Sequence, residues 1–249
     1  MELGKGLTEH RKRVLPLIQN APATVPDRIE VSGNAKTGAS INSTIVETCQ
    51  PTGRCMEYCY GKRGPVTFKN SILLQHRNVL RFNYLETATQ SEVDAEALRI
   101  AYTVLASGEN WIRWNGVGDL VPGSVRVVNA LARLRPDITQ WVVSRKVAEV
   151  GKLEDLPSIK ILFSLDETTP DTIRHRAESL ASTYKRAAFR FAWTRTATSG
   201  MAPPNVSIVF NEHIGKHHGA WSDDVRVCAA TLPGNTHTDT CATCRRCFA

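Results

Sequence analysis

Seven cysteines gather in two short stretches of the chain, and their spacing is typical of metal binding. Three form a C-x5-C-x3-C loop, and four lie near the end of the chain, where the last three run C-x2-C-x2-C. Buried structural cysteines are instead scattered singly through strands and helices. An odd number of cysteines, together with an N-terminus that lacks the apolar segment of an export signal, argues against a disulfide framework. The predicted metal ligands are Cys49, Cys55, Cys59, Cys228, Cys241, Cys244 and Cys247.

The spacing leaves the identity of the metal open. Four thiolates suit tetrahedral zinc and an iron–sulfur cluster equally well. The crowded run at the end of the chain resembles ferredoxin ligation, which favours iron, whereas His217, His218 and His237 keep zinc as the alternative. Three cysteines upstream and four downstream suit one [4Fe-4S] cluster with an open iron position and a second with none. A single centre, either shared by both stretches or held by the last four cysteines alone, is the other possibility.

The hydrophobic pattern between the two stretches predicts an α/β fold. Helices and strands alternate, which favours a parallel sheet, and six strands suit a barrel or partial barrel. No repeat or linker divides the chain, so we expect a basic N-terminal arm over 1–35, a partial α/β barrel over 36–215 and a metal-binding segment over 216–249. The expected strands are 43–48, 111–115, 140–144, 160–165, 187–193 and 206–210, and the main expected helices are 69–86, 93–106, 125–134, 146–153 and 171–183.

Polar residues follow several of these strands at the point where each strand ends. The first cysteine loop follows 43–48, and Asp119, Ser144 and Asp166 follow later strands. In parallel α/β folds the carboxyl ends of the strands meet on one rim, where chemistry gathers. Each residue taken singly could instead be an ordinary helix cap or turn residue. Together they predict a site on that rim beside the first three cysteines.

This arrangement resembles the radical S-adenosylmethionine fold. Tyr58 precedes the third cysteine, Gly118-Asp119 follows the second expected strand, and Ser164-Leu165-Asp166 ends a later one. The resemblance implies a partial (β/α)6 barrel whose three-cysteine loop holds a [4Fe-4S] cluster, with S-adenosylmethionine on the open iron. It further implies that Tyr58, Gly118, Asp119, Ser144 and Asp166 line the cofactor, that Asp119 receives its amino group, and that an electron donor is needed. The loop here is longer than the usual C-x3-C-x2-C.

Over its full length the chain more closely resembles the phage gene product 88 family. Residues 36–40, Thr48-Cys49, the stretch from Cys55 to Tyr60, Gly118-Asp119 and the terminal cysteines carry this likeness. The resemblance implies a phage origin and a metal-bearing barrel, and it leaves the reaction and its substrate open.

The chain carries a formal charge of +7 and has a pI of about 9.2. Such a charge makes nucleic acid a plausible partner, although the basic residues form only short clusters at 10–13, 62–63 and 245–246. The alternative function is therefore a non-catalytic, metal-stabilised protein that binds nucleic acid or a host factor. No stretch approaches the roughly 20 apolar residues of a membrane span, so we expect no membrane association and a location in the host-cell cytoplasm.

Overall fold

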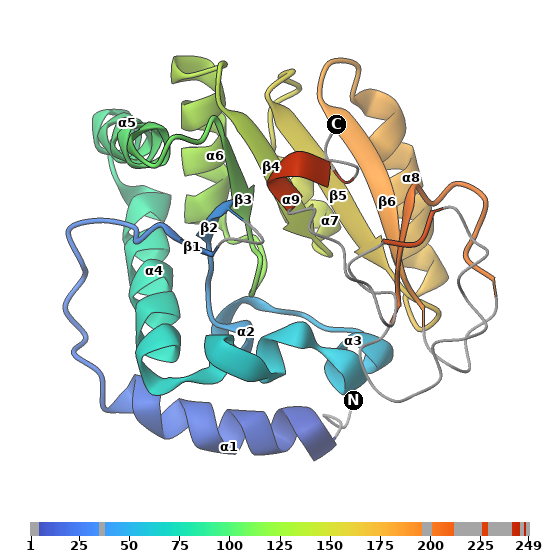
Figure 1. Cartoon of the computed structure of the whole chain (residues 1–249), viewed down its shortest axis with the longest axis horizontal. Helices are drawn as coiled ribbons and strands as arrows, with labels where there is room; N and C mark the ends of the chain where they lie inside the picture. The colour runs from blue at the N-terminus through green and yellow to red at the C-terminus, as the bar shows by residue number, and fades with distance from the viewer. Residues whose placement is uncertain are drawn as a thin grey trace.

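The computed structural model describes residues 5–34, 38–195, 201–211, 226–228, 241–244 and 247, which form one mixed α/β assembly (Figure 1). The strands are β1 (Ser32–Asn34), β2 (Gly38–Ile41), β3 (Trp111–Trp114), β4 (Thr139–Ser144), β5 (Ile159–Leu165), β6 (Ala188–Arg195) and β7 (Ile208–Asn211). The helices are α1 (Lys5–Gln19), α2 (Ile45–Thr48), α3 (Gly53–Tyr58), α4 (Lys69–Thr87), α5 (Gln90–Ala106), α6 (Pro122–Leu134), α7 (Val147–Val150), α8 (Asp171–Thr183) and α9 (Cys241–Cys244), with 3-10 turns at Tyr60–Lys62 and Gly64–Thr67.

The seven strands of the described residues form a single sheet in chain order from β1 to β7. β1 and β2 pair antiparallel, and every later neighbour pairs parallel. Because parallel crossovers are right-handed, a sheet in strict chain order carries its connecting helices on one face. The α/β class and the parallel sheet predicted from the sequence are therefore confirmed.

One predicted strand is wrong. Residues 43–48 end in the short helix α2, and the strand that leads to the cysteine loop is β2, which ends at Ile41. The β-branched residues of this stretch favour a strand locally, but the chain must turn at the end of β2 to pass beneath the sheet. The Thr48 hydroxyl donates to the Thr44 carbonyl at 2.7 Å, which satisfies a backbone group that a strand would have paired.

The two faces of the sheet bury different partners. Ile112 and Trp114 of β3 face the main core, which α4, α5, α6 and α8 complete. The alternate residues, among them Trp111, belong to a second apolar cluster on the opposite face, as expected from the two-residue period of a strand. α9 lies across this second face, in front of β4 and β5 in Figure 1. We call it the inner face.

The N-terminal segment is a helix that packs against the rest of the structure. α1 contacts α4 and α3, and Val14 on α1 is buried. The chain then runs to β1, and the Ile29 amide donates to the buried Glu96 carboxylate of α5 at 2.9 Å. Among the described residues, no helix is long and apolar enough to cross a membrane.

Candidate functional site

The first three cysteines lie in the long segment that connects β2 to α4, beneath the carboxyl ends of the strands (Figure 1). Cys49 ends α2, Cys55 lies in the first turn of α3, and Cys59 follows α3 directly. Thr52 caps α3, because its hydroxyl accepts a hydrogen bond from the Cys55 amide at 3.3 Å. We call Cys49, Cys55 and Cys59 the upstream set.

Two of the upstream cysteines interact directly. A hydrogen bond between the Cys55 and Cys59 side chains lowers the pKa of Cys55 and raises the pKa of Cys59. Burial, together with the neighbouring Asp119 and Cys55, raises the pKa of Cys49. Metal binding displaces such protons, because thiolates are the ligands.

Asp119 ties the end of β3 to the end of β4. Its Oδ1 accepts hydrogen bonds from the Ser144 hydroxyl at 2.6 Å and the Leu120 amide at 2.8 Å, and its own amide donates to Thr48 Oγ1 at 3.0 Å. Burial raises the pKa of Asp119, although these donors oppose the shift. Asp119 Oδ2 accepts a longer bond, 3.3 Å, from the Arg145 amide.

Asp166 fastens the cysteine loop to the end of β5. Its Oδ2 accepts hydrogen bonds from Arg145 Nη1 at 2.7 Å and from the Thr52 hydroxyl at 2.5 Å, and its Oδ1 accepts from Thr168 at 2.8 Å. The carboxylate side chain is fully buried. Burial opposes ionisation, but the Arg145 charge and these hydroxyls prevail and lower the pKa of Asp166. Because Thr52 also caps α3, one carboxylate fixes the helix that carries Cys55.

Gly118 allows the turn after β3 to lie in close contact with Ser43, just before α2. Its φ is +86°, and an added Cβ would lie 2.0 Å from Ser43 Oγ and 2.5 Å from the Ser43 carbonyl oxygen. Only glycine fits this position. The predicted Gly118-Asp119 turn is therefore a real close approach between β3 and the upstream loop.

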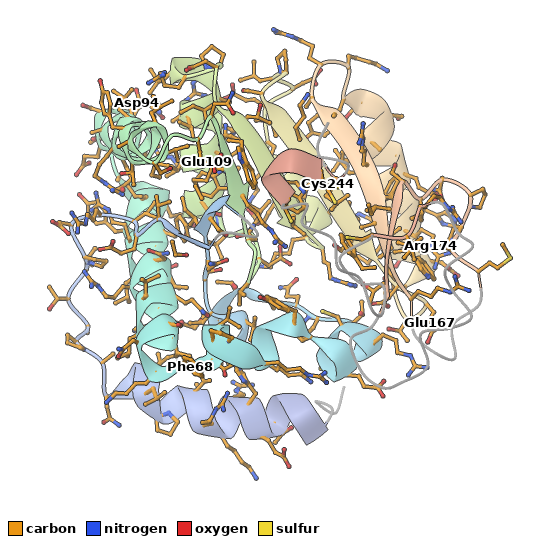
Figure 2. All side chains as sticks on the ribbon, in the orientation of Figure 1. Phe68, Asp94, Glu109, Glu167, Arg174 and Cys244 are labelled. Atoms are coloured by element: carbon orange, nitrogen blue, oxygen red, sulfur yellow. The ribbon has the colours of Figure 1, made fainter. Side chains whose placement is uncertain are left out.

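The last four cysteines, which we call the tail set, lie at the inner face of the sheet. Cys228 follows an isolated bridge to β7, and its amide donates to the Val209 carbonyl at 2.8 Å. Cys241 and Cys247 pack against the inner-face apolar cluster, and Cys244, labelled in Figure 2, is exposed on α9. Burial and the other three tail cysteines raise the pKa of Cys247 to about 12, which places all four within interaction range.

Arg113 of β3 lies beside the tail set. Its guanidinium stacks on the Trp141 ring, with 4.5 Å between the guanidinium carbon and the ring centroid. Burial lowers the pKa of Arg113, and the charges of Cys241, Cys247 and Tyr60 oppose that shift. Tyr60 directly follows the upstream set in the chain.

The structure thus brings together most of the residues predicted from the sequence. Asp119, Ser144 and Asp166 join the upstream set in one hydrogen-bonded network. Tyr58 ends α3, and its side chain lies outside the described part, as do His217, His218 and His237. All seven cysteines are free of disulfides. In the described ranges, no three Cys, His, Asp or Glu side chains stand close enough to hold one metal ion.

Sequence reasoning misses the residues that connect these groups. Nothing in the cysteine or strand-end pattern singles out Thr52 or Arg113, and Arg145 stands out only as a strand-end neighbour of Ser144. A charged residue inside a short apolar strand that has a tryptophan at each end is the one available signal for Arg113. Thr52 has a weaker sequence signal, since a threonine three residues before Cys55 fits a helix cap.

Comparison with known proteins identifies a family. The family model described as gene product 88 matches residues 15–249, a span that contains both cysteine sets and all the strand-end residues above. No curated protein and no solved structure matches the chain significantly.

Proposed function

Because the chain belongs to the gene product 88 family of phage proteins, whose name specifies no reaction, we propose its function from the site itself. We propose an iron–sulfur protein of the radical S-adenosylmethionine type, or a divergent relative, with one metal centre at each cysteine set. The main observation in support is that three cysteines lie beside a network of buried carboxylates at the carboxyl edge of a parallel sheet. That edge is where α/β folds place their chemistry.

The donor types and their surroundings support the proposal. Cysteine thiolates are the usual ligands of iron–sulfur clusters. One partly buried arginine lies beside each set, Arg145 upstream and Arg113 at the tail, and would provide positive charge for an anionic centre. Bound at the upstream set, a [4Fe-4S] cluster with S-adenosylmethionine would supply one-electron reductive chemistry. Cys49, Cys55 and Cys59 would hold it, and the tail set would hold the second cluster.

The chain's own residues then have distinct tasks. Arg145 and Asp166 hold the capped end of α3 in place, so that Cys55 is positioned before any metal arrives. Asp119 Oδ1 is occupied by Ser144 and Leu120, but its Oδ2 carries one long bond and has capacity for an ammonium donor. The tail set covers the apolar inner face and excludes water from it.

Metal analysis tests the two-centre proposal. Iron, acid-labile sulfide and zinc are measured per chain on anaerobically purified protein and on the Cys55→Ala and Cys244→Ala variants. We expect each variant to lose part of the iron and keep the rest. Loss of all metal in both variants would instead establish one shared centre, and zinc without sulfide would contradict the iron–sulfur assignment.

A cleavage assay tests the S-adenosylmethionine part. Reconstituted protein is incubated anaerobically with S-adenosylmethionine and a strong reductant, and 5′-deoxyadenosine is quantified. We expect the wild type to form 5′-deoxyadenosine and Cys244→Ala to form less of it. Cys55→Ala should form none. If iron loads normally but no deoxyadenosine forms, the protein binds a cluster without this chemistry.

One observation favours a second candidate, nucleic-acid binding on the surface of α1. Lys62 lies near enough to His10 to contribute to lowering its pKa, so the basic clusters at 10–13 and 62–63, far apart in sequence, share one surface. Arg11, Lys12 and Arg63 on it are exposed. Binding to DNA and RNA at low salt should then fall steeply with salt and with Arg11→Glu and Arg63→Glu. Undetectable binding at low salt would eliminate this candidate.

A further inference from the structure

Two partly buried arginines, one on β3 and one just after β4, differ in whether a carboxylate pairs with them. Arg145, after β4, forms an ion pair with the fully buried Asp166, with 2.7 Å between Nη1 and Oδ2. For Arg113, on β3, no carboxylate lies within ion-pair distance in the described part of the chain, and its buried Nε lacks a hydrogen-bond partner there. A buried polar atom of a charged group without a partner is costly, so the Arg113 position favours a nearby anion.

The groups around Arg113 identify where that anion belongs. One side of the guanidinium is covered by the Trp141 ring. Trp141 belongs to the inner-face apolar cluster against which Cys228, Cys241 and Cys247 pack. Negative charge on these three cysteines, or on Tyr60, would stabilise the guanidinium. As thiols these cysteines carry no charge, whereas four thiolates around zinc or around a [4Fe-4S] core leave a formal charge of about −2.

We propose that Arg113 is the counter-charge of a metal–thiolate centre at the tail set, held in position by stacking on Trp141. This inference rests on the proposed function, because it requires that the tail set bind metal. Arg113 is a positioning residue, since it acts on the centre through charge and packing and supplies no ligand. The arrangement also explains how an arginine is tolerated in the middle of an apolar strand.

The geometry specifies what a substitution should do. Arg113→Met keeps the apolar stem but removes the charge, and Arg113→Gln removes the charge while keeping polar atoms. Arg113→Lys keeps the charge but loses the planar face that stacks on Trp141. Arg135, which pairs with Asp137 after the end of α6, is the matched control, because it lies at the opposite edge of the sheet from the carboxyl strand ends.

The experiment isolates the tail centre in the full-length chain. All variants carry Cys55→Ala, which disables the upstream set. Protein is purified anaerobically, iron and zinc are measured per chain, and the bound metal is then titrated against a chelator. Loss of a neighbouring group outside the ligand shell typically weakens metal binding by about 10–100-fold. We expect that loss for Arg113→Met and Arg113→Gln, a smaller loss for Arg113→Lys, and no change for Arg135→Met.

Each outcome decides a separate question. If the Arg113→Met variant retains as much metal as its Cys55→Ala parent, the counter-charge inference is overturned, whereas the proposed metal centre at the tail set is retained. A parent that holds no metal overturns the tail centre and the inference with it. Circular dichroism of the metal-free proteins checks that the sheet is intact. If Arg113→Met loses metal but Arg113→Gln does not, the loss reflects a packing defect, and the role of charge is overturned.

Discussion

At the scale of single residues, the candidate site depends on a few side chains that join the cysteine loop to the strand ends. Thr52, Arg145 and Asp166 form a chain of contacts from α3 to β5. None of them is a predicted metal ligand, yet Cys55 is held through them. Substitutions at these residues should therefore alter stability as well as metal binding.

Asp166→Ala should strongly destabilise the protein. The change leaves the Arg145 guanidinium buried without its carboxylate and frees the Thr52 hydroxyl. Removing one partner of a buried ion pair typically costs about 3–5 kcal/mol. Chemical denaturation of metal-free protein measures the loss, and Asp137→Ala, which breaks an exposed pair with Arg135, is the control and should leave the midpoint unchanged. A similar loss in both variants would contradict the role of burial.

Gly118→Ala should destabilise the protein more than Gly64→Ala. Both glycines have positive φ, +86° and +64°, so each substitution carries a backbone penalty of about 1–2 kcal/mol. An added Cβ at Gly64 meets nothing within 4 Å, whereas at Gly118 it would overlap Ser43. We expect a total loss above about 3 kcal/mol at Gly118. Equal thermal midpoints for the two variants would show that the turn after β3 relaxes freely.

At the scale of elements, α1 acts as a brace against the segment that carries the upstream set. It contacts α3 and α4, and His10 on α1 is buried, with Arg13 Nη2 3.4 Å from its Nδ1. Burial comes first among the causes that lower the pKa of His10, followed by the charges of Arg13 and Lys62. The docking of α1 is therefore coupled to the protonation of one imidazole.

His10 should make folding stability depend on pH. Its folded pKa lies below the unfolded value of about 6.5, so the unfolded chain binds more protons as the pH falls through that value. Stability is thus fully present above about pH 6.5 and declines below it until the folded pKa is passed. His10→Gln should flatten this part of the profile. Free energies of unfolding measured across this window check the prediction, and identical slopes in both proteins would contradict it.

Element prediction from the sequence succeeds where periodicity and breakers agree. The helix expected at 171–183 is α8 with the same bounds, and the helix expected at 69–86 is α4, which ends one residue later. The strand expected at 43–48 is wrong, because β-branched residues such as Ile45 and Val46 favour a strand only where a neighbour can pair with them. Here β3 pairs with Gly38–Ile41 instead, and the following residues turn into α2.

At the scale of the whole molecule, the tail set completes the inner face. Trp111, Trp141 and Leu162 come from three strands and are buried there, with Cys228, Cys241 and Cys247 packed against them. The outer face has helices to cover it, but the inner face depends on the last part of the chain. The tail set is therefore also a structural cover.

Deletion of residues 226–249 should expose the inner-face apolar cluster. We expect higher binding of a hydrophobic dye and lower solubility, because contiguous apolar surface of this kind favours association. The secondary structure should be largely kept, since Val227 is the one buried residue of the main core that the deletion removes. Dye fluorescence and circular dichroism measure both effects, with Cys244→Ala as the control. Unchanged dye binding would mean that other residues cover this face.

Local pattern in the chain is sufficient for the α/β alternation, the grouping of cysteines into three and four, and the placement of Asp119, Ser144 and Asp166 at strand ends. These follow from short-range spacing and from the two-residue and 3.6-residue periods of strands and helices. Only the folded chain shows that Asp166 reaches Thr52, 114 residues away, and that Arg113 lies beside the tail set. The physical reason is that burial pairs charges across distant segments, and no local pattern records which segments the sheet brings together.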